Sequence, residues 1–60
     1  MTQLQRWREA RGYSKAELSR RSRVARPDIA NVEAGARPFY PKWQQRCADA
    51  LGVSIDQLQG

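Results

Sequence analysis

The stretch SKAELSRRSRVARPDIANVEAG, residues 14–35, predicts two short helices joined by a tight break. Ser14 and Glu17 have capping-box spacing, in which the serine hydroxyl and the glutamate carboxylate satisfy two free amides at a helix start. They open a predicted helix over about 15–21. After a break at Ser22 to Ala25, a second helix is predicted from about Pro27 to Ala34, because proline is tolerated in a first helical turn. The common apolar seam between them is expected from Leu18, Val24, Ile29 and Val32.

Two helices joined in this way form a helix-turn-helix, whose second helix can enter the major groove of DNA. A simple corner between two helices shows the same apolar pattern, so the pattern alone leaves both interpretations open. The outward side of the second helix carries Pro27, Asn31 and Ala34, which are almost without apolar surface to bury. This side therefore needs an explanation beyond core packing.

The remaining segments predict three more helices, over about 3–11, over about 41–51 and in a short segment opened by a second capping box at Ser54 and Gln57. Three glycines suit the left-handed position that follows a helix: Gly12, Gly35 and Gly52. Inward positions are expected at Leu4, Trp7, Trp43, Cys47, Ala50, Leu51, Ile55 and Leu58. No stretch alternates as a strand. We therefore expect an all-α fold of five short helices, with residues 1–60 forming one domain.

The positive charge is concentrated around the predicted helix-turn-helix. The chain has a net charge of +5, and all of this excess falls at or before Arg37, because the charges from Pro38 onward cancel. The second helix is flanked by Arg20, Arg21, Arg23, Arg26 and Arg37. Arginine binds phosphate bidentately, which favours a nucleic-acid partner. The alternative is a solvated basic surface.

Composition argues against several other classes. The chain has no histidine and a single cysteine, so a disulfide within the chain and a Cys/His zinc site are excluded. It lacks paired carboxylates and a glycine-rich phosphate loop, so we expect no enzyme, metal, cofactor or small-molecule substrate. No apolar run approaches a membrane span of about 18 residues, and no signal-peptide pattern opens the chain. The expectation is a cytoplasmic, nucleoid-associated protein without a membrane partner.

The segments LQRWREARGYSKAELSRRSRVARPDIANVEAG (4–35) and ADALGVSIDQL (48–58) resemble the Cro/repressor (XRE) helix-turn-helix family. The resemblance lies in the joint order and spacing of these features: Arg8, Gly12, Ser14, Glu17, Leu18, Val24, Ile29, Val32, Glu33, Gly35 and the run from Ala50 to Ser54. It implies a lambda-repressor-like bundle of five helices whose second and third helices form the helix-turn-helix. It also implies a regulator that binds double-stranded DNA, usually as a homodimer on a near-palindromic operator.

Three positions depart from the family's pattern. Lys15 stands where the family often has a glutamine near the phosphates. Arg23 replaces a frequent glycine in the turn, at a cost of about 1 kcal/mol if the backbone is left-handed there. Pro27 occupies a place where relatives commonly use a polar base-reading side chain. These departures weaken the transfer of the family's contacts to this chain.

The candidates for reading bases lie at the start and on the outward side of the second helix. Arg26 can reach a guanine edge or a phosphate, and Asn31 can pair with adenine. Pro27 offers only apolar contact, such as to a thymine methyl, and is more simply a helix-start residue. Asp28 could accept a hydrogen bond from cytosine, but is better explained as a helix cap that discourages wrong sequences. Arg26 and Asn31 also have a simple alternative, which is exposure to solvent.

The candidates for phosphate contact are Lys15, Arg37 and, more weakly, Arg23, together with the amides at the starts of the two helices. The resemblance further implies that Arg8 and Glu33 pair structurally across the first and third helices. Such a pair would orient the predicted recognition helix.

Two other functions stay open. The chain could be a protein-interaction module that keeps the fold without DNA binding, which the residues Arg23, Pro27 and Asp28 favour. It could also be the DNA-binding part of an antitoxin or another autoregulator. A dimer interface could come from Phe39, Tyr40 and the region of the last two helices, or from a longer protein. The operator, the regulated genes and the sign of regulation do not follow from the sequence.

Overall fold

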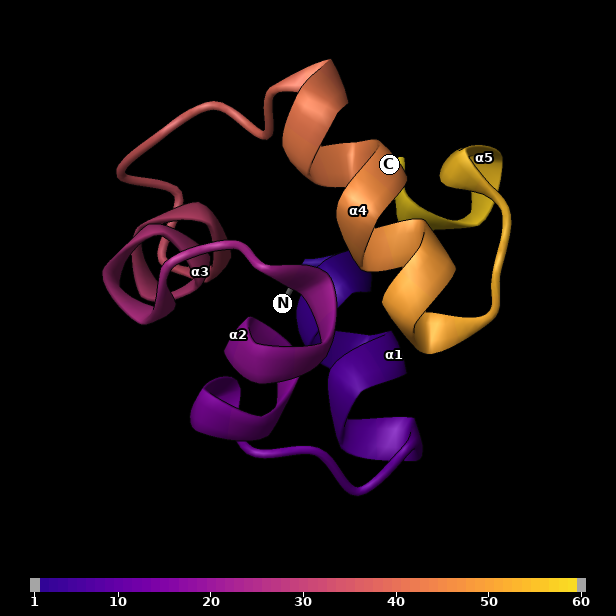
Figure 1. Cartoon of the computed structure of the whole chain (residues 1–60). Helices are drawn as coiled ribbons and strands as arrows, with labels where there is room; N and C mark the ends of the chain where they lie inside the picture. The colour runs from indigo at the N-terminus through magenta and orange to yellow at the C-terminus, as the bar shows by residue number, and fades with distance from the viewer. Residues whose placement is uncertain (1, 60) are drawn as a thin grey trace.

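A computed structural model describes residues 2–59, and these residues form five α-helices and no strand. The helices are α1 (Gln3–Ala10), α2 (Lys15–Ser22), α3 (Arg26–Glu33), α4 (Pro41–Leu51) and α5 (Ile55–Leu58). In Figure 1, α1 and α2 lie at the centre, α4 and α5 on one side, and α3 at the opposite edge, seen nearly along its axis. The predicted all-helical bundle is confirmed. The recognition-helix candidate begins and ends one residue earlier than predicted.

Hydroxyl side chains cap three of the helices. Thr2 accepts a hydrogen bond from the Gln5 amide at the start of α1, and Ser54 and Gln57 form the complete capping box predicted for α5. The helices α3 and α4 instead begin with a proline in the first turn and have no side-chain cap. The prediction that Asp28 caps α3 is therefore wrong, because the cap position is Ala25.

The capping box predicted at the start of α2 is only half formed. The Ser14 hydroxyl accepts a hydrogen bond from the Glu17 amide at 3.0 Å. The Glu17 carboxylate does not return to the backbone of Ser14, because it binds the guanidinium groups of Arg20 and Arg21. Two cations one turn ahead on the same helix thus outcompete the amide donor.

The turn between α2 and α3 is closed by two neighbouring residues. Arg23 has φ 61° and ψ 25°, the left-handed conformation that normally favours glycine. The buried Ser22 hydroxyl accepts a hydrogen bond from the Val24 amide at 3.2 Å. This turn directs the chain from α2 into α3.

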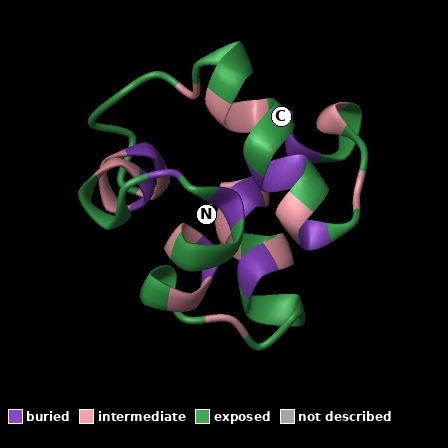
Figure 2. Cartoon of the chain, viewed as in Figure 1, coloured by how far each residue is buried: buried purple, intermediate pink, exposed green. Residues whose placement is uncertain are grey.

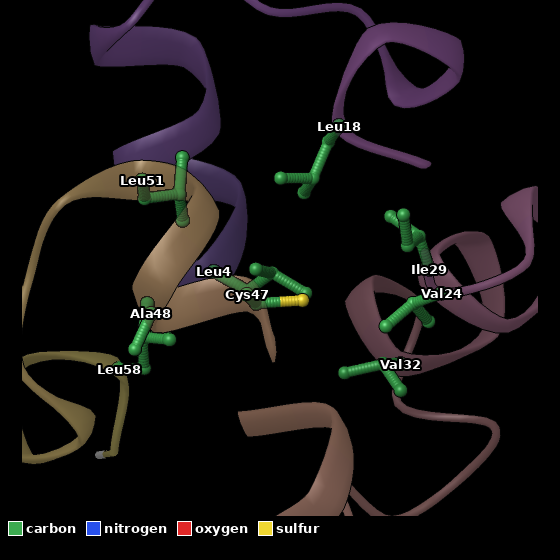
Figure 3. Packing of buried hydrophobic residues seen from close by; sticks show 9 residues of the cluster. All are labelled: Leu4, Leu18, Val24, Ile29, Val32, Cys47, Ala48, Leu51 and Leu58. Carbon is green, nitrogen blue, oxygen red and sulfur yellow. The ribbon is translucent and has the colours of Figure 1, made fainter. Parts of the chain in front are cut away.

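The core joins all five helices around Cys47, which is fully buried (Figure 3). Figure 3 shows its sulfur between Leu4 of α1 and the aliphatic side chains at the turn and α3. The buried apolar residues are Leu4, Leu18, Val24, Ile29, Val32, Cys47, Ala48, Leu51 and Leu58. The apolar seam predicted for the helix-turn-helix is therefore confirmed in full.

Some inward positions were predicted incorrectly. Trp7 and Trp43 are only partly buried and pack against the edge of the core, as do Ala50 and Ile55, while Ala48 is buried instead. Each indole has a reason to reach the surface. The Trp7 nitrogen donates to the Gln57 carbonyl at 3.2 Å, and the Trp43 ring meets the Tyr40 ring edge to face, with centroids 4.9 Å apart.

The described residues contain no helix that is both long and apolar enough to span a membrane. Within the bundle, α2 packs against both α4 and α3. One side of α3 faces the bundle. Figure 2 shows buried positions on the inner side of α3, exposed positions at its start and partly buried positions over the rest of the helix. The fold therefore presents α3 at its surface.

Candidate nucleic-acid interface

The inner side of α3 is fixed by apolar contacts and by an ion pair. Ile29 and Val32 are 1% and 6% exposed. Glu33 follows them on the same side, where its carboxylate accepts hydrogen bonds from Arg8 of α1 at 2.8 Å to Nε and 3.0 Å to the terminal nitrogen. The third anchoring bond runs from Arg8 to the Tyr13 carbonyl at 2.9 Å.

This ion pair is shielded from water, since the side chains of Arg8 and Glu33 are 10% and 4% exposed. The hydrogen bonds to the Glu33 carboxylate raise the pKa of the Arg8 guanidinium, which keeps the cation charged despite its burial. Bidentate geometry of this kind fixes orientation as well as distance. The structure thus forms the pair that the resemblance implies, and the pair holds α3 against α1.

The base-reading candidates lie along the outer side and the start of α3. Arg26 and Pro27 are exposed, whereas Asp28 and Asn31 are partly buried. None of these side chains forms a hydrogen bond or an ion pair with any residue from 2 to 59. The side chains on the outer side of α3 are therefore without partners in the described chain.

The phosphate candidates occupy three backbone positions before and after α3. Lys15 opens α2, Arg23 occupies the left-handed turn, and Arg37 follows the end of α3. All three are exposed, and their side chains have no hydrogen-bond or salt-bridge partner between residues 2 and 59. Two backbone hydrogen bonds fix the loop that carries Arg37. The amides of Ala36 and Arg37 donate to the Asn31 carbonyl at 2.8 and 3.3 Å.

Not every arginine near the helix-turn-helix is free to bind a ligand. Arg21 pairs with Glu17 at 2.8 Å and lies over the Tyr13 ring, 4.6 Å from its centroid. Arg20 also pairs with Glu17. The basic cluster seen in the sequence thus divides into two paired arginines and a set of unpaired cations around α3.

Sequence reasoning missed several supporting residues. Ser22 was assigned only to the break, yet its hydroxyl closes the turn. Arg11 was counted only as a charge, yet its Nε donates to the Leu51 carbonyl at 2.9 Å and so joins α1 to the end of α4. A serine beside the turn is a signal that could have suggested the first contact. No local pattern predicts the hydrogen bond of Arg11, because its two partners are 40 residues apart.

The geometry defines a helix-turn-helix: α2, a turn closed by a left-handed residue, and α3 with an unpartnered outer side. The family model described as a helix-turn-helix domain matches residues 2–59, and the chain belongs to this family, which is of the XRE/Cro-like type. No curated protein and no solved structure matches the chain significantly. Since helix-turn-helix domains are a DNA-binding type, the family indicates DNA as the partner and regulation as the role.

Proposed function

We propose that the chain is a sequence-specific regulator that inserts α3 into the major groove of double-stranded DNA. The observation that carries this proposal is the outer side of α3, whose Arg26, Asp28 and Asn31 side chains have no partner among residues 2–59, while its inner side is fixed by Ile29, Val32 and Glu33. A rigid helix with a free polar side at the surface suits the groove, which is wide enough to admit one helix.

In this proposal, Arg26 and Asn31 read base edges. An arginine at the helix start can pair bidentately with guanine, and an asparagine on the outer side can pair bidentately with adenine, each worth about 1–3 kcal/mol of discrimination. Pro27 supplies at most an apolar contact. Asp28 repels phosphate and can accept a hydrogen bond from a base amine such as cytosine N4, so it penalises sequences that present only acceptors there.

Lys15, Arg23 and Arg37 fix the register by contacting phosphates on both sides of α3. If each contacts one phosphate, the logarithm of the binding constant falls by about 2.7 per subunit for a tenfold rise in salt. One helix-turn-helix reads few base pairs, so we further propose that two copies bind a near-palindromic operator with half-sites about one helical turn apart. We further propose that the chain acts as a repressor by occupying such an operator, and an antitoxin-type autoregulator would act in the same way.

Selection from a random DNA pool tests the proposal most directly. A palindromic consensus is expected, and fluorescence anisotropy on it should show affinity falling steeply with salt. Lys15→Gln and Arg37→Gln should each flatten the salt slope by about 0.9 per bound subunit, while the matched control Arg46→Gln on α4 should leave it unchanged. Recovery of no consensus, with affinity flat in salt, would refute the proposal and favour a protein-interaction module of the same fold.

Asn31→Ala tests the reading of bases separately from the phosphate contacts. It should lower affinity for the selected site by about 1–3 kcal/mol and leave the salt slope and the binding of random DNA unchanged. An equal loss on random DNA would show that Asn31 does not read sequence.

A further inference from the structure

A hollow of about 350 Å³ lies where the start of α1, the end of α3, the loop after α3 and the end of α5 meet. Its volume is near the lower end of the range of about 300–1,000 Å³ that is usual for small-molecule sites. The floor is apolar, because it is formed by the buried Leu4, Val32 and Leu58 together with the partly buried Phe39. The hollow is on the side of the bundle that carries the loop to Arg37.

The polar part of the hollow carries one positive charge. Arg37 is the one charged residue among its lining residues in the described chain, and it has no ion-pair partner between residues 2 and 59. Gln44 is held in place, since its amide donates to the Phe39 carbonyl at 2.7 Å and accepts from Gln59 at 3.3 Å. Each of these two amide groups keeps one further N–H to donate. An apolar floor, a cation and spare donors complement an anionic head on an apolar body.

We propose that this hollow binds a small carboxylate with an apolar body, and that the bound carboxylate competes with DNA phosphate for Arg37. A planar carboxylate suits the guanidinium because two N–H groups can bind its two oxygens. The competition rests on the proposed function, whereas the binding of the carboxylate does not. The ligand would thus act as an effector that lowers the affinity of the protein for its operator.

The binding can be tested on the 60-residue chain without DNA, using 3-phenylpropionate and its uncharged analogue 3-phenylpropanol as probes in a ¹H–¹⁵N NMR titration. Saturable shifts are expected at Val32, Arg37, Phe39 and Leu58. The acid should bind about threefold to fivefold more tightly than the alcohol, as an exposed ion pair allows. Arg37→Gln should remove this difference, and Arg46→Gln should preserve it.

Several results would overturn the site. These are shifts that do not saturate, shifts scattered over the whole molecule, or equal affinity for the acid and the alcohol. Shifts that vanish on diluting the protein would show that a second copy, not a small carboxylate, occupies the hollow. An absence of binding would show that the hollow is closed by the chain itself.

The competition is measured by anisotropy on the selected operator. Saturating 3-phenylpropionate should lower the DNA affinity of the natural chain and leave that of Arg37→Gln unchanged, while 3-phenylpropanol serves as the control ligand. An equal effect on both proteins would overturn the competition. If the chain binds no DNA at all, the competition falls with the proposed function, but the NMR titration still decides the site.

Discussion

The shielded ion pair between Arg8 and Glu33 is the most consequential polar contact in the molecule. Removing one partner of a buried pair leaves an uncompensated charge, which typically costs about 3–5 kcal/mol. In a domain of this size the total stability is only a few kcal/mol. The orientation of α3 and the survival of the fold therefore depend on the same two side chains.

We expect Glu33→Gln to lower the free energy of unfolding by about 3 kcal/mol, because it leaves the Arg8 cation without its counter-charge. The matched control is Glu9→Gln on α1, since Glu9 is 50% exposed and lies 3.9 Å from Arg8. This change should cost less than about 1 kcal/mol. Urea denaturation of the two variants measures both values, and equal losses would contradict a structural role for the pair.

Arg23 in the turn combines backbone strain with a proposed contact to phosphate. Its left-handed conformation costs a residue with a β-carbon about 1 kcal/mol. We expect Arg23→Gly to stabilise the fold by about 0.5–1 kcal/mol and at the same time to weaken DNA binding. Arg20→Gly, in the interior of α2, should instead destabilise by about 1 kcal/mol. Thermal melts compare the two, and a lower melting temperature for Arg23→Gly would contradict this account.

At the scale of elements, each helix begins at a local feature, such as a capping side chain or a proline. Its position, however, depends on contacts with distant residues. The start of α2 depends on Ser14, while the salt bridges of Glu17 lie on its solvent side. The end of α4 is joined to α1 by Arg11, whose guanidinium also lies over the Trp7 ring at 5.3 Å. The recognition helix α3 has no side-chain cap, so its position depends on the inner side and on the turn.

The half-formed capping box gives a prediction for α2. Ser14→Ala removes the acceptor for the Glu17 amide and should cost about 1 kcal/mol of unfolding free energy. Glu17→Gln removes two exposed ion pairs, at about 0.2–0.5 kcal/mol each, and should cost less than Ser14→Ala. Urea denaturation at matched pH orders the two variants. The reverse order would show that the ion pairs, not the hydroxyl, stabilise the start of this helix.

At the scale of the whole molecule, a small core ties every helix to one buried thiol. Burial raises the pKa of Cys47 from an ordinary 9.0 to about 11, although a hydrogen bond with Ser22 works in the opposite direction. The folded state therefore keeps the thiol protonated where the unfolded chain has already lost the proton. The corresponding stability is fully present below about pH 9 and is lost as the pH rises toward 11.

We expect the unfolding free energy of the natural chain to fall more steeply between pH 8 and pH 11 than that of Cys47→Ala. The difference should reach about 2–3 kcal/mol, at about 1.4 kcal/mol for each pKa unit. All other side chains are the same in the two proteins, so the comparison isolates the thiol. Parallel pH profiles in urea denaturation would show that Cys47 is accessible to solvent or ionises normally in the folded state.

Local signals in the sequence determined which segments are helical and which class of fold they build. Hydroxyl caps, prolines in first turns and glycines after helix ends act over a few residues. They can therefore be recognised in the sequence without the tertiary structure. The seam of Leu18, Ile29 and Val32 follows from helical periodicity in the same way. The concentration of charge before Arg37 is likewise a property of composition alone.

Only the tertiary structure decided which side chains pair and which remain unpaired. Arg11 was expected only to add charge, yet its side chain donates to the Leu51 carbonyl 40 residues away. Trp7 fits an inward position by periodicity, but its indole is only partly buried and donates to the Gln57 carbonyl, 50 residues away. Such choices depend on distances between segments that are remote in the chain. They determine that Arg26, Arg37 and Lys15 stay unpaired around α3, and the proposed interface depends on this outcome.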